Sequence, residues 1–548
     1  MAEAADASRE EAVDAVVVGA GFAGLYMLYK MRILGLTARG FEAGTNVGGT
    51  WYWNRYPGAR CDVDSLEYSF SFSEELQQEW TWSERFATQP EILSYLDHVA
   101  DRFDLRREIS FETRVTAAVF DEADGTWAVQ TDRGHRLRCR YCIMATGNLS
   151  DARLPDIPGI ETFAGPIYHT GRWPKEAVAF EGKRVAVIGT GSSGIQAVPA
   201  IAETAAHVTV FQRTPNFSIP ARNAPQDPEQ TTRYKSQYAE KRRDARKTSA
   251  GILYDYNDIP ALSVDPERRQ QDYEARWLKG GVNFIRTYAD ISLSEPANET
   301  AAEFVRGKIR SIVNDQKTAE MLLPRDHPIG TKRICVDSGY FQAFNRDNVG
   351  LVDLRKTPIA AITADQIRTT DATIPTDILV LATGYDAVTG TLARIDIRGR
   401  GGVGLSAKWA DGPRSYLGLM SAGFPNLFTV TGPGSPGILT NVVVSIEQHV
   451  EWIADCIGHM ESEGLALIEP EQGAEDAWVD HVQEVAGKTL MVKAKSWYMG
   501  ANIPGKPRLF LPYAGGFYAF KQKCDAVVAN GYEGFRFTSA PRPETAAA

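Results

Sequence analysis

Two segments of the chain show the same order of apolar and polar positions. The first is DAVVVGAGFAGLYMLYKMRILGLTARGFEA (residues 14–43) and the second is KRVAVIGTGSSGIQAVPAIAETAAHVTVFQRT (residues 183–214). In both, a short β-branched apolar run is followed by glycines and then by apolar residues at helical spacing. Each segment therefore predicts a strand, a tight turn, a helix and a second strand, which is the βαβ unit of a parallel sheet.

Two further apolar runs end in glycine turns, RYCIMATGNLS (residues 140–150) and TDILVLATGYD (residues 376–386). We expect the chain to cross between domains at these turns, at Gly147 and Gly384. Residues 222–325 have few strand signals and much charged helical spacing, which predicts a helical insertion. A solvated helix face is expected for the basic run of this insertion, which comprises Lys241, Arg242, Arg243, Arg246 and Lys247.

The bulk composition is that of an ordinary globular protein. A chain of 548 residues is too long for one compact core, so its length favours two or three domains. With 59 Lys and Arg against 69 Asp and Glu, the formal charge is -10, so we expect no nucleic-acid partner. The N-terminal MAEAADASREEA lacks the basic start and apolar core of a secretion signal, and no apolar run approaches the ~20 residues of a membrane span. We expect a cytoplasmic protein without an integral membrane segment, with a monomer as its simplest state.

Metal and disulfide chemistry are not expected. The six cysteines are scattered, and their one close pair, Cys139 and Cys142, has no second pair to complete a zinc site. The eight histidines show no HxxxH spacing. Reduced thiols and no protein metal site are therefore predicted.

The first βαβ segment carries glycines at a spacing that suits a dinucleotide. Gly19, Gly21 and Gly24 follow the predicted strand and open the predicted helix, so the backbone can approach a pyrophosphate at the helix N-terminus. Glu42 stands at the end of the second strand, where a carboxylate accepts hydrogen bonds from ribose hydroxyls. A glycine turn used only for packing is the alternative, and the joint presence of strand, helix and acid argues against it.

The second segment has the same glycine pattern but lacks the acid. Gly189, Gly191 and Gly194 form its loop, and its second strand is followed by Arg213 and Thr214. An arginine at this place can pair with a 2′-phosphate that a carboxylate would repel. The first loop is therefore predicted to bind FAD and the second to bind NADPH.

The predicted fold is α/β with two Rossmann-like dinucleotide-binding domains, one for FAD and one for NADPH. We expect the FAD-binding domain to be discontinuous, with residues 1–149 and 386–548, and the NADPH-binding domain to comprise residues 150–385. The helical insertion, about residues 222–325, interrupts the NADPH-binding domain.

An aromatic and glycine-rich stretch follows the first βαβ segment. VGGTWYWNRYPGARCDVDS (residues 47–65), named the aromatic loop below, offers Gly49, Thr50 and Trp51 for close contact with a flavin ring. Its conspicuous carboxylate is Asp62. Aromatic loops more often serve packing, but the glycine pair favours cofactor contact here.

A longer motif, FAGPIYHTGRWP (residues 163–174), lies between the two glycine loops. It resembles the FxGxxxHTxxWP signature of type I Baeyer-Villiger monooxygenases, with matches at Phe163, Gly165, His169, Thr170, Trp173 and Pro174. The resemblance covers nearly the whole chain and is strongest to the phenylacetone, steroid and cyclohexanone monooxygenase group, for example in GFPNLFTVTGPGSP and SWYMGANIPGKPR. It implies that His169 serves domain coupling rather than direct proton transfer.

The same resemblance implies roles for residues whose sequence context alone says little. Arg333 in GTKRI matches the active-site arginine, and Asp62 matches the carboxylate that positions it. Lys332 matches a second ligand of the NADPH 2′-phosphate, and Trp497 matches a residue that reaches the bound nicotinamide cofactor. These four residues complete the predicted site.

The activity implied by the resemblance is insertion of one oxygen atom of O2 next to a ketone carbonyl, giving an ester or lactone. NADPH would reduce FAD, O2 would add at flavin C4a, and the resulting peroxide would attack the ketone. Arg333 would stabilise the peroxide and the negatively charged adduct. The expected partners are a ketone substrate and O2, and the sequence does not specify which ketone.

Three other functions share part of this pattern. An N- or S-oxygenating flavin monooxygenase has both glycine loops, but its family motif lacks the Trp-Pro found at Trp173 and Pro174. A flavin disulfide reductase needs a redox cysteine pair beside the flavin, where this chain offers only Cys61. A non-enzymatic dinucleotide sensor needs neither the aromatic loop nor Arg333.

Overall fold

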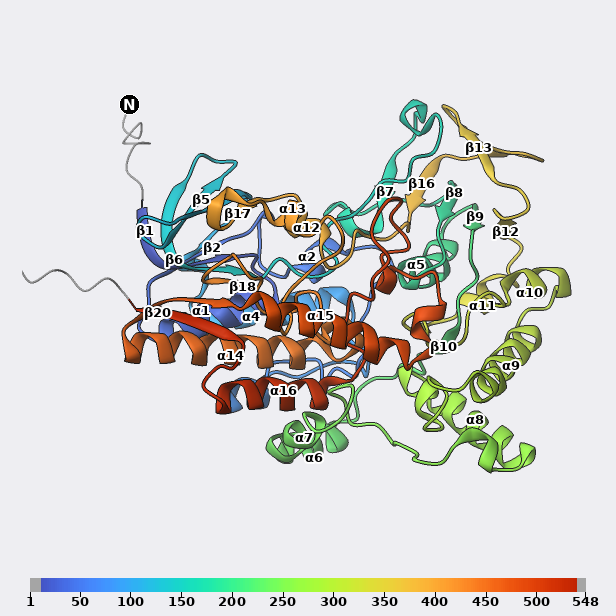
Figure 1. The fold of residues 1–548 in the computed structure, drawn as a ribbon. Coiled ribbons are helices and arrows are strands. Elements are labelled where there is room, and N and C mark those ends of the chain that lie inside the picture. Colours follow the sequence, from blue (N-terminus) through green and yellow to red (C-terminus); the bar gives the residue numbers. More distant parts are fainter. Residues whose placement is uncertain (1–10, 540–548) are drawn as a thin grey trace, which may run out of the picture.

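The computed structural model describes residues 11–539, so the terminal segments 1–10 and 540–548, and with them most of the acidic N-terminal stretch, lie outside the described residues. Two main sheets lie on opposite sides of the molecule, and the helices of residues 266–322 extend beyond the second (Figure 1). Each of these sheets contains one predicted βαβ unit. The predicted α/β class with two Rossmann-like halves is confirmed.

The first sheet is parallel on one side and mixed on the other, where two antiparallel pairs are followed by one parallel pair at the edge. From that edge to the other it contains β17 (Asp396–Arg398), β4 (Val115–Asp121), β5 (Thr126–Thr131), β6 (Arg136–Met144), β1 (Glu11–Val18), β2 (Ala38–Phe41) and β3 (Ile109–Ser110). A further strand, β18 (Leu427–Thr429), also pairs with β6. Helix α1 (Phe22–Ile33) connects β1 to β2, as the apolar pattern predicts.

The second sheet is parallel throughout. From edge to edge it contains β12 (Val349–Asp353), β9 (His207–Gln212), β8 (Arg184–Ile188), β16 (Ile378–Leu381) and β7 (Ile167–His169). Helix α5 (Ser192–Ala202) connects β8 to β9 and completes the second predicted unit.

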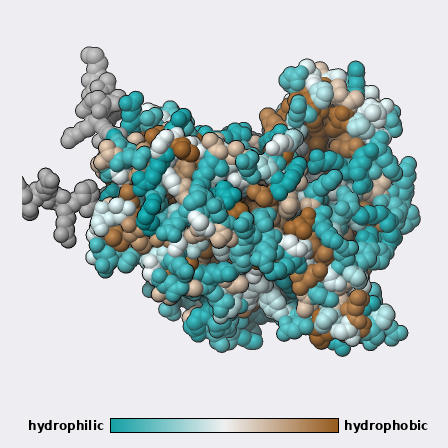
Figure 2. Space-filling model, viewed as in Figure 1, coloured by the Kyte–Doolittle hydropathy of each residue, from teal (hydrophilic) through white to brown (hydrophobic). Residues whose placement is uncertain are grey.

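Each sheet is covered by its own apolar core, because a parallel sheet must be shielded from water on both faces. Against the first sheet pack α1 and the long helix α14 (Val442–Glu463), whose buried residues form one cluster with the aromatic loop. α5 packs in a separate cluster around the second sheet. The face of the molecule in Figure 2 is mainly hydrophilic, as this arrangement requires.

Residues 222–325 contain helices and no strand, as predicted. The helices are α6 (Pro228–Ser236), α7 (Tyr238–Ala245), α8 (Pro266–Lys279), α9 (Glu295–Ile312) and α10 (Gln316–Leu322). Tyr273 and Trp277 of α8 and Phe304 of α9 belong to the core of the second sheet. Tyr238 of α7, in contrast, belongs to the core of the first. The insertion therefore spans both halves of the molecule.

The basic run on α7 is not a simple solvated face, so that prediction is wrong for two of its members. Arg242 donates to the backbone carbonyl of Glu67 at 2.8 Å. Arg246 pairs with Glu451 at 2.9 Å and with Glu447 at 3.3 Å. Glu447 is 1% exposed, and a buried carboxylate on α14 requires such a cation. Hydrophobic periodicity does not reveal that these carboxylates need a cation, because Glu447 and Glu451 lie 201 and 205 residues from Arg246 in the sequence.

The two connections between the sheets run side by side. The chain leaves β6 through Gly147 (φ +72°) and leaves β16 through Gly384 (φ +83°), both in the left-handed region that favours glycine. Just beyond these turns, Ala152 and Tyr385 form a β-bridge. The chain after Gly384 then returns to the first sheet as β17 and β18.

The signature (residues 163–174) connects the second sheet to the aromatic loop. It supplies edge strand β7, which ends at His169 and pairs with β16. Gly165 is needed here, because a Cβ at that position would lie 2.3 Å from the carbonyl oxygen of Asp377. At the other end, the N–H of Trp173 donates to the carbonyl of Trp53 in the aromatic loop at 3.3 Å.

His169 is buried and held in one tautomer. Its Nδ1 accepts from the N–H of Gly171 at 2.9 Å, so Nε2 carries the proton and points it at the hydroxyl of Thr383 at 3.3 Å. That hydroxyl donates to the carbonyl of Arg153 at 3.1 Å. Burial, and then the charge of Arg172, lower the pKa of His169 to about 4. A neutral histidine with both ring nitrogens occupied serves as a fixed link between segments.

His169 should make the stability of the protein depend on pH. Its pKa is lowered on folding from 6.5 to about 4, so between these values the unfolded chain binds more protons and stability falls as the pH falls. The contribution is on the order of 3 kcal/mol. His169→Asn keeps an acceptor for Gly171 but cannot titrate, so its loss of melting temperature from pH 7.5 to pH 5 should be smaller than that of the wild type. Buried His449 leaves a residual dependence, because burial lowers its pKa too. Identical pH profiles for the two proteins would contradict this assignment.

Candidate active site

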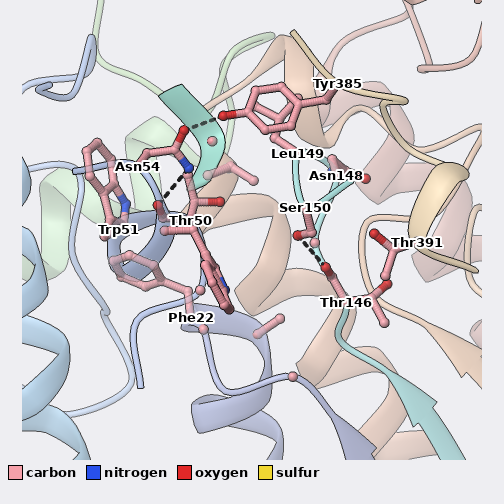
Figure 3. Close-up of a pocket in the computed structure, with 18 of the residues that line it drawn as sticks. Phe22, Thr50, Trp51, Asn54, Thr146, Asn148, Leu149, Ser150, Tyr385 and Thr391 are labelled. Carbon is pink, nitrogen blue, oxygen red and sulfur yellow. Dashed lines mark hydrogen bonds between the residues drawn. The ribbon is translucent and has the colours of Figure 1, made fainter. Parts of the chain in front are cut away.

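A cavity of about 810 Å³ lies where the two glycine-loop regions face each other. This volume is typical of pockets for small molecules and cofactors. Residues of the first glycine loop, the aromatic loop, α5 and the two crossing turns line it. Figure 3 shows part of this lining, with Phe22 and Trp51 on one side and Thr146, Asn148 and Thr391 on the other.

The first glycine loop presents the N-terminus of α1 to this cavity. A Cβ at Gly24 would lie 1.8 Å from the carbonyl oxygen of Gly19, so only glycine allows the helix to start so close to β1. Gly21 is the N-cap of α1, and no side chain caps the helix. Its first N–H groups therefore remain available for an anion. Glu42 is buried beside them and accepts from the N–H groups of Ala20 at 3.0 Å and Gly44 at 2.7 Å.

The start of the aromatic loop packs directly against this glycine loop. Gly49 has φ +52°, and a Cβ there would lie 3.0 Å from Cα of Gly21. Thr50 and Trp51 follow as the first residues of the short helix α2 (Thr50–Trp53), and all three line the cavity. The indole N–H of Trp51 is fixed by the hydroxyl of Tyr68 at 3.1 Å. The two loops can lie this close only because both positions are glycine.

The second glycine loop repeats this design at α5. Gly189 has φ +113°, and a Cβ at Gly194 would lie 2.2 Å from its carbonyl oxygen. Gly191 is the N-cap of α5, again without a capping side chain, and Ser192 and Ser193 of its first turn line the cavity. Two uncapped helix N-termini thus face one cavity, which fits two dinucleotide pyrophosphates.

The predicted 2′-phosphate ligands come together beside the second loop. Thr214 follows β9 and accepts at its carbonyl from the hydroxyl of Thr190 in the glycine loop at 2.8 Å. Burial is the largest influence that lowers the pKa of Lys332, and the positive charge of Arg213 adds to it. Arg213 and Lys332 thus lie within electrostatic reach of each other, with Asp326 as the opposing charge, and two such cations favour a dianionic partner. Arg213 and Lys332 do not line the cavity itself.

Asp62 and Arg333 meet as a bidentate ion pair in the cavity wall. The guanidinium donates from Nε to Oδ2 at 2.5 Å and from Nη2 to Oδ1 at 2.9 Å. Its Nη1 donates to the carbonyl of Ile438 at 2.9 Å. Burial alone would lower the pKa of Arg333, and the carboxylate of Asp62 more than offsets this and raises it. The site therefore holds a permanent cation with a fixed orientation.

The cavity wall is mainly apolar. Its apolar side chains include Val63 beside Asp62, Ile438 beside Arg333, and Val442, Ile446 and Trp497. Trp497 begins a short 3₁₀ turn, and its ring packs on that of Tyr498 at 4.6 Å between centroids. An apolar wall excludes water and strengthens the field of the cation.

Most of the signature lies behind the cavity surface. Gly171 and Arg172 line the cavity, but the matching positions do not, namely Phe163, Gly165, His169, Thr170, Trp173 and Pro174. His169 and Thr170 lie buried beside β16, and Thr170 donates to the carbonyl of Leu381 at 3.5 Å. This placement agrees with a coupling role and keeps His169 off the cavity surface.

Sequence reasoning missed several residues of the site. Tyr385, which follows the second crossing turn, donates from its hydroxyl to Oδ1 of Asn54, and both line the cavity (Figure 3). Gln196 on α5 accepts from the hydroxyl of Tyr56 at 2.8 Å and also lines it. These contacts join segments that are 140 or more residues apart, so no local pattern marks them.

Neither a metal site nor a membrane span occurs among the described residues. Within residues 11–539, no group of His, Cys, Asp or Glu side chains is suited to hold a metal ion. No helix in that part of the chain is long and apolar enough to cross a membrane. All six cysteines are buried free thiols, so a redox pair beside the cavity is absent from the described structure.

Comparison with known proteins supports the same interpretation. A model of the pyridine nucleotide-disulphide oxidoreductase family matches residues 16–243, which include both glycine loops. A Baeyer-Villiger monooxygenase of Pseudooceanicola batsensis is 43% identical over 95% of each chain. A phenazine N-monooxygenase of Lysobacter antibioticus is 42% identical over 96% of this chain and 97% of its own.

Among solved structures, an oxidized steroid monooxygenase bound to NADP is 51% identical and superimposes with a TM-score of 0.93 over 97% of this chain and 100% of its own. Identity at this level over nearly the full length, together with the two glycine loops facing one cavity, establishes the family. The chain belongs to the FAD- and NADPH-dependent Baeyer-Villiger monooxygenases.

Proposed function

We propose that the enzyme oxidises an apolar ketone and that the Asp62–Arg333 pair stands at its reacting centre. The observation that carries this proposal is the position of the pair, in the wall of the cavity that both glycine loops share. When bound, NADPH and FAD supply the hydride and the activation of O2. The chain supplies the binding, the orientation and the fixed charge.

The first glycine loop and its neighbours suit FAD. The uncapped N-terminus of α1 would hold the pyrophosphate with its free N–H groups, and Glu42 would accept from ribose. Gly49, Thr50 and Trp51 would lie along the flavin ring, where the glycine leaves room and the indole supplies a flat apolar surface.

The second loop and the two cations suit NADPH. The first turn of α5 would hold its pyrophosphate, and Arg213, Thr214 and Lys332 would surround its 2′-phosphate. Trp497 would then lie over the nicotinamide side of the cavity. NADH lacks the 2′-phosphate, so it would leave both cations without a partner.

Arg333 is proposed as the residue that stabilises developing negative charge on the ketone oxygen. Asp62 fixes its plane, so little reorganisation is needed when that charge appears. The surrounding apolar side chains keep water away from the reacting carbonyl. This division of roles requires no proton transfer from His169.

The apolar wall and the relatives together favour a bulky hydrocarbon ketone. The relatives include enzymes named for steroid and cyclohexanone oxidation, and we propose an alicyclic or aryl ketone for this chain. N-oxygenation is the second candidate, because a phenazine N-monooxygenase is 42% identical. We further propose a monomer in the cytoplasm, whose reducing conditions suit six free cysteines.

A panel of substrates tests the proposed reaction. Linear, cyclic, aryl and steroidal ketones, with phenazine as the nitrogen substrate, should be incubated with NADPH in air and the products identified by mass spectrometry. Cyclic or aryl ketones should give esters or lactones at the highest kcat/KM. Oxygenation of phenazine alone would replace the proposal with N-oxygenation.

Arg333 should separate the two halves of the catalytic cycle. In Arg333→Ala, ester formation should fall by at least about 100- to 1000-fold, the cost of removing one oxyanion-stabilising donor. Flavin reduction by NADPH, followed anaerobically by stopped-flow absorbance, should persist. Arg333→Lys should recover only part of the loss, because an ammonium cannot form the bidentate bond to Asp62. Wild-type ester yields from Arg333→Ala would remove this residue from the mechanism.

Arg213 should determine the preference for NADPH. Arg213→Ala should raise the KM for NADPH by about 10- to 100-fold, because a hydrogen bond to a charged group contributes about 1.5 to 3 kcal/mol. The KM for NADH is the internal control and should change little. Steady-state kinetics with both cofactors measure this, and equal changes for the two would show that Arg213 does not meet the 2′-phosphate.

A further inference from the structure

Tyr385 is the point at which four segments of the cavity wall meet. It follows the turn at Gly384, lines the cavity, and its backbone forms the β-bridge with Ala152. Its carbonyl accepts from the side-chain amide of Asn502 at 2.7 Å, five residues beyond Trp497. The crossing segments and the Trp497 segment are thereby joined through the backbone of one residue.

The side chain of Tyr385 reaches the other two segments. Its hydroxyl donates to Oδ1 of Asn54, and Nδ2 of Asn54 donates to the carbonyl of Thr50 at 2.8 Å (Figure 3). The phenol therefore fixes Asn54, the residue that directly follows helix α2 as its C-cap.

The ring of Tyr385 packs against the signature. It meets the ring of His169 edge-on, with centroids 6.0 Å apart and planes at 77°. At Gly171 a Cβ would lie 2.5 Å from a ring carbon of Tyr385, so this glycine provides the space for the phenol. The signature thus reaches the aromatic loop through Tyr385 as well as through the backbone contact of Trp173 with Trp53.

Hydride transfer is the step most sensitive to such a link. Each cofactor is held by a different glycine loop, and hydride transfer needs the two cofactors at near-attack distance. A displacement of about 1 Å can lower the rate about 100-fold. We infer that Tyr385 is a positioning residue for hydride transfer, which fixes the aromatic loop relative to the signature and the Trp497 segment through its hydroxyl. This inference rests on the cofactor placement proposed above and assigns a role beyond it.

Tyr385→Phe removes the hydroxyl and leaves the ring. Anaerobic stopped-flow at saturating NADPH should show flavin reduction slowed about fivefold to tenfold, the effect of one neutral hydrogen bond. The dissociation constant for NADPH should stay within about twofold, because the 2′-phosphate and pyrophosphate contacts do not involve Tyr385. A purely structural role would instead lower the melting temperature and leave the reduction rate unchanged.

Tyr273→Phe is the matched control. Its hydroxyl is also buried and bonded, to Thr300 at 2.7 Å, but Tyr273 does not line the cavity. It should lower stability with no change in flavin reduction. Equal reduction rates in Tyr385→Phe and wild type, or an equal slowing in Tyr273→Phe, would overturn the inference.

A double-mutant cycle with Asn54→Ala identifies the partner. If the hydroxyl acts through Asn54, adding Tyr385→Phe to Asn54→Ala should slow reduction no further, whereas independent multiplicative losses would overturn this route. FAD content, measured after denaturation, normalises every rate. These rates need no ketone, so a failure of the wild type to form esters would reject the proposed substrate while the test of Tyr385 still stands.

Discussion

The contact between Asp62 and Arg333 in the cavity wall is the constraint on which the rest of the site depends. Withdrawing a charge from water is costly unless an opposite charge pairs with it, so these partly buried groups are held as a well-bonded pair. Two hydrogen bonds join them, and the remaining guanidinium nitrogen is occupied by the carbonyl of Ile438. The aromatic loop, the segment before Cys335 and the turn at Ile438 must therefore converge on one cation.

Backbone contacts at glycines provide the second constraint. In each glycine loop the last glycine lies against the first, Gly24 against Gly19 and Gly194 against Gly189. These contacts direct an uncapped helix N-terminus towards the cavity from each side. The side-chain contacts then hold the two sides in place. Arg246 of the insertion is bonded to the buried Glu447 and to the partly exposed Glu451 of α14, so a segment that follows the second βαβ unit in sequence is attached to the half that contains the first sheet.

Local patterns were sufficient for most of the fold. Both βαβ units, the helical content of residues 222–325 and the glycine loops follow from apolar periodicity and the steric need for glycine. The resemblance supplied Arg333 and Asp62, whose contact spans 271 residues and which no spacing rule pairs. Arg246 and Tyr385 were missed for the same reason, since their partners become neighbours only after the sheets have formed. The role of a charge run or of a single tyrosine depends on which groups are buried around it, and the sequence alone does not show this.

The positive charge of Arg333 affects which substrates the site favours. As a carbonyl carbon is attacked, negative charge builds on its oxygen, and a nearby guanidinium stabilises it. A nitrogen that is oxygenated builds positive charge, which the same guanidinium opposes. Asp62 cancels much of this field at a distance, so the selection acts only on a substrate oxygen that reaches Arg333 itself. The choice between ketone and nitrogen oxygenation then depends on where the apolar wall holds the substrate relative to Arg333. Overall identity, which is 43% to a Baeyer-Villiger monooxygenase and 42% to an N-monooxygenase, does not measure the distance from the substrate to Arg333.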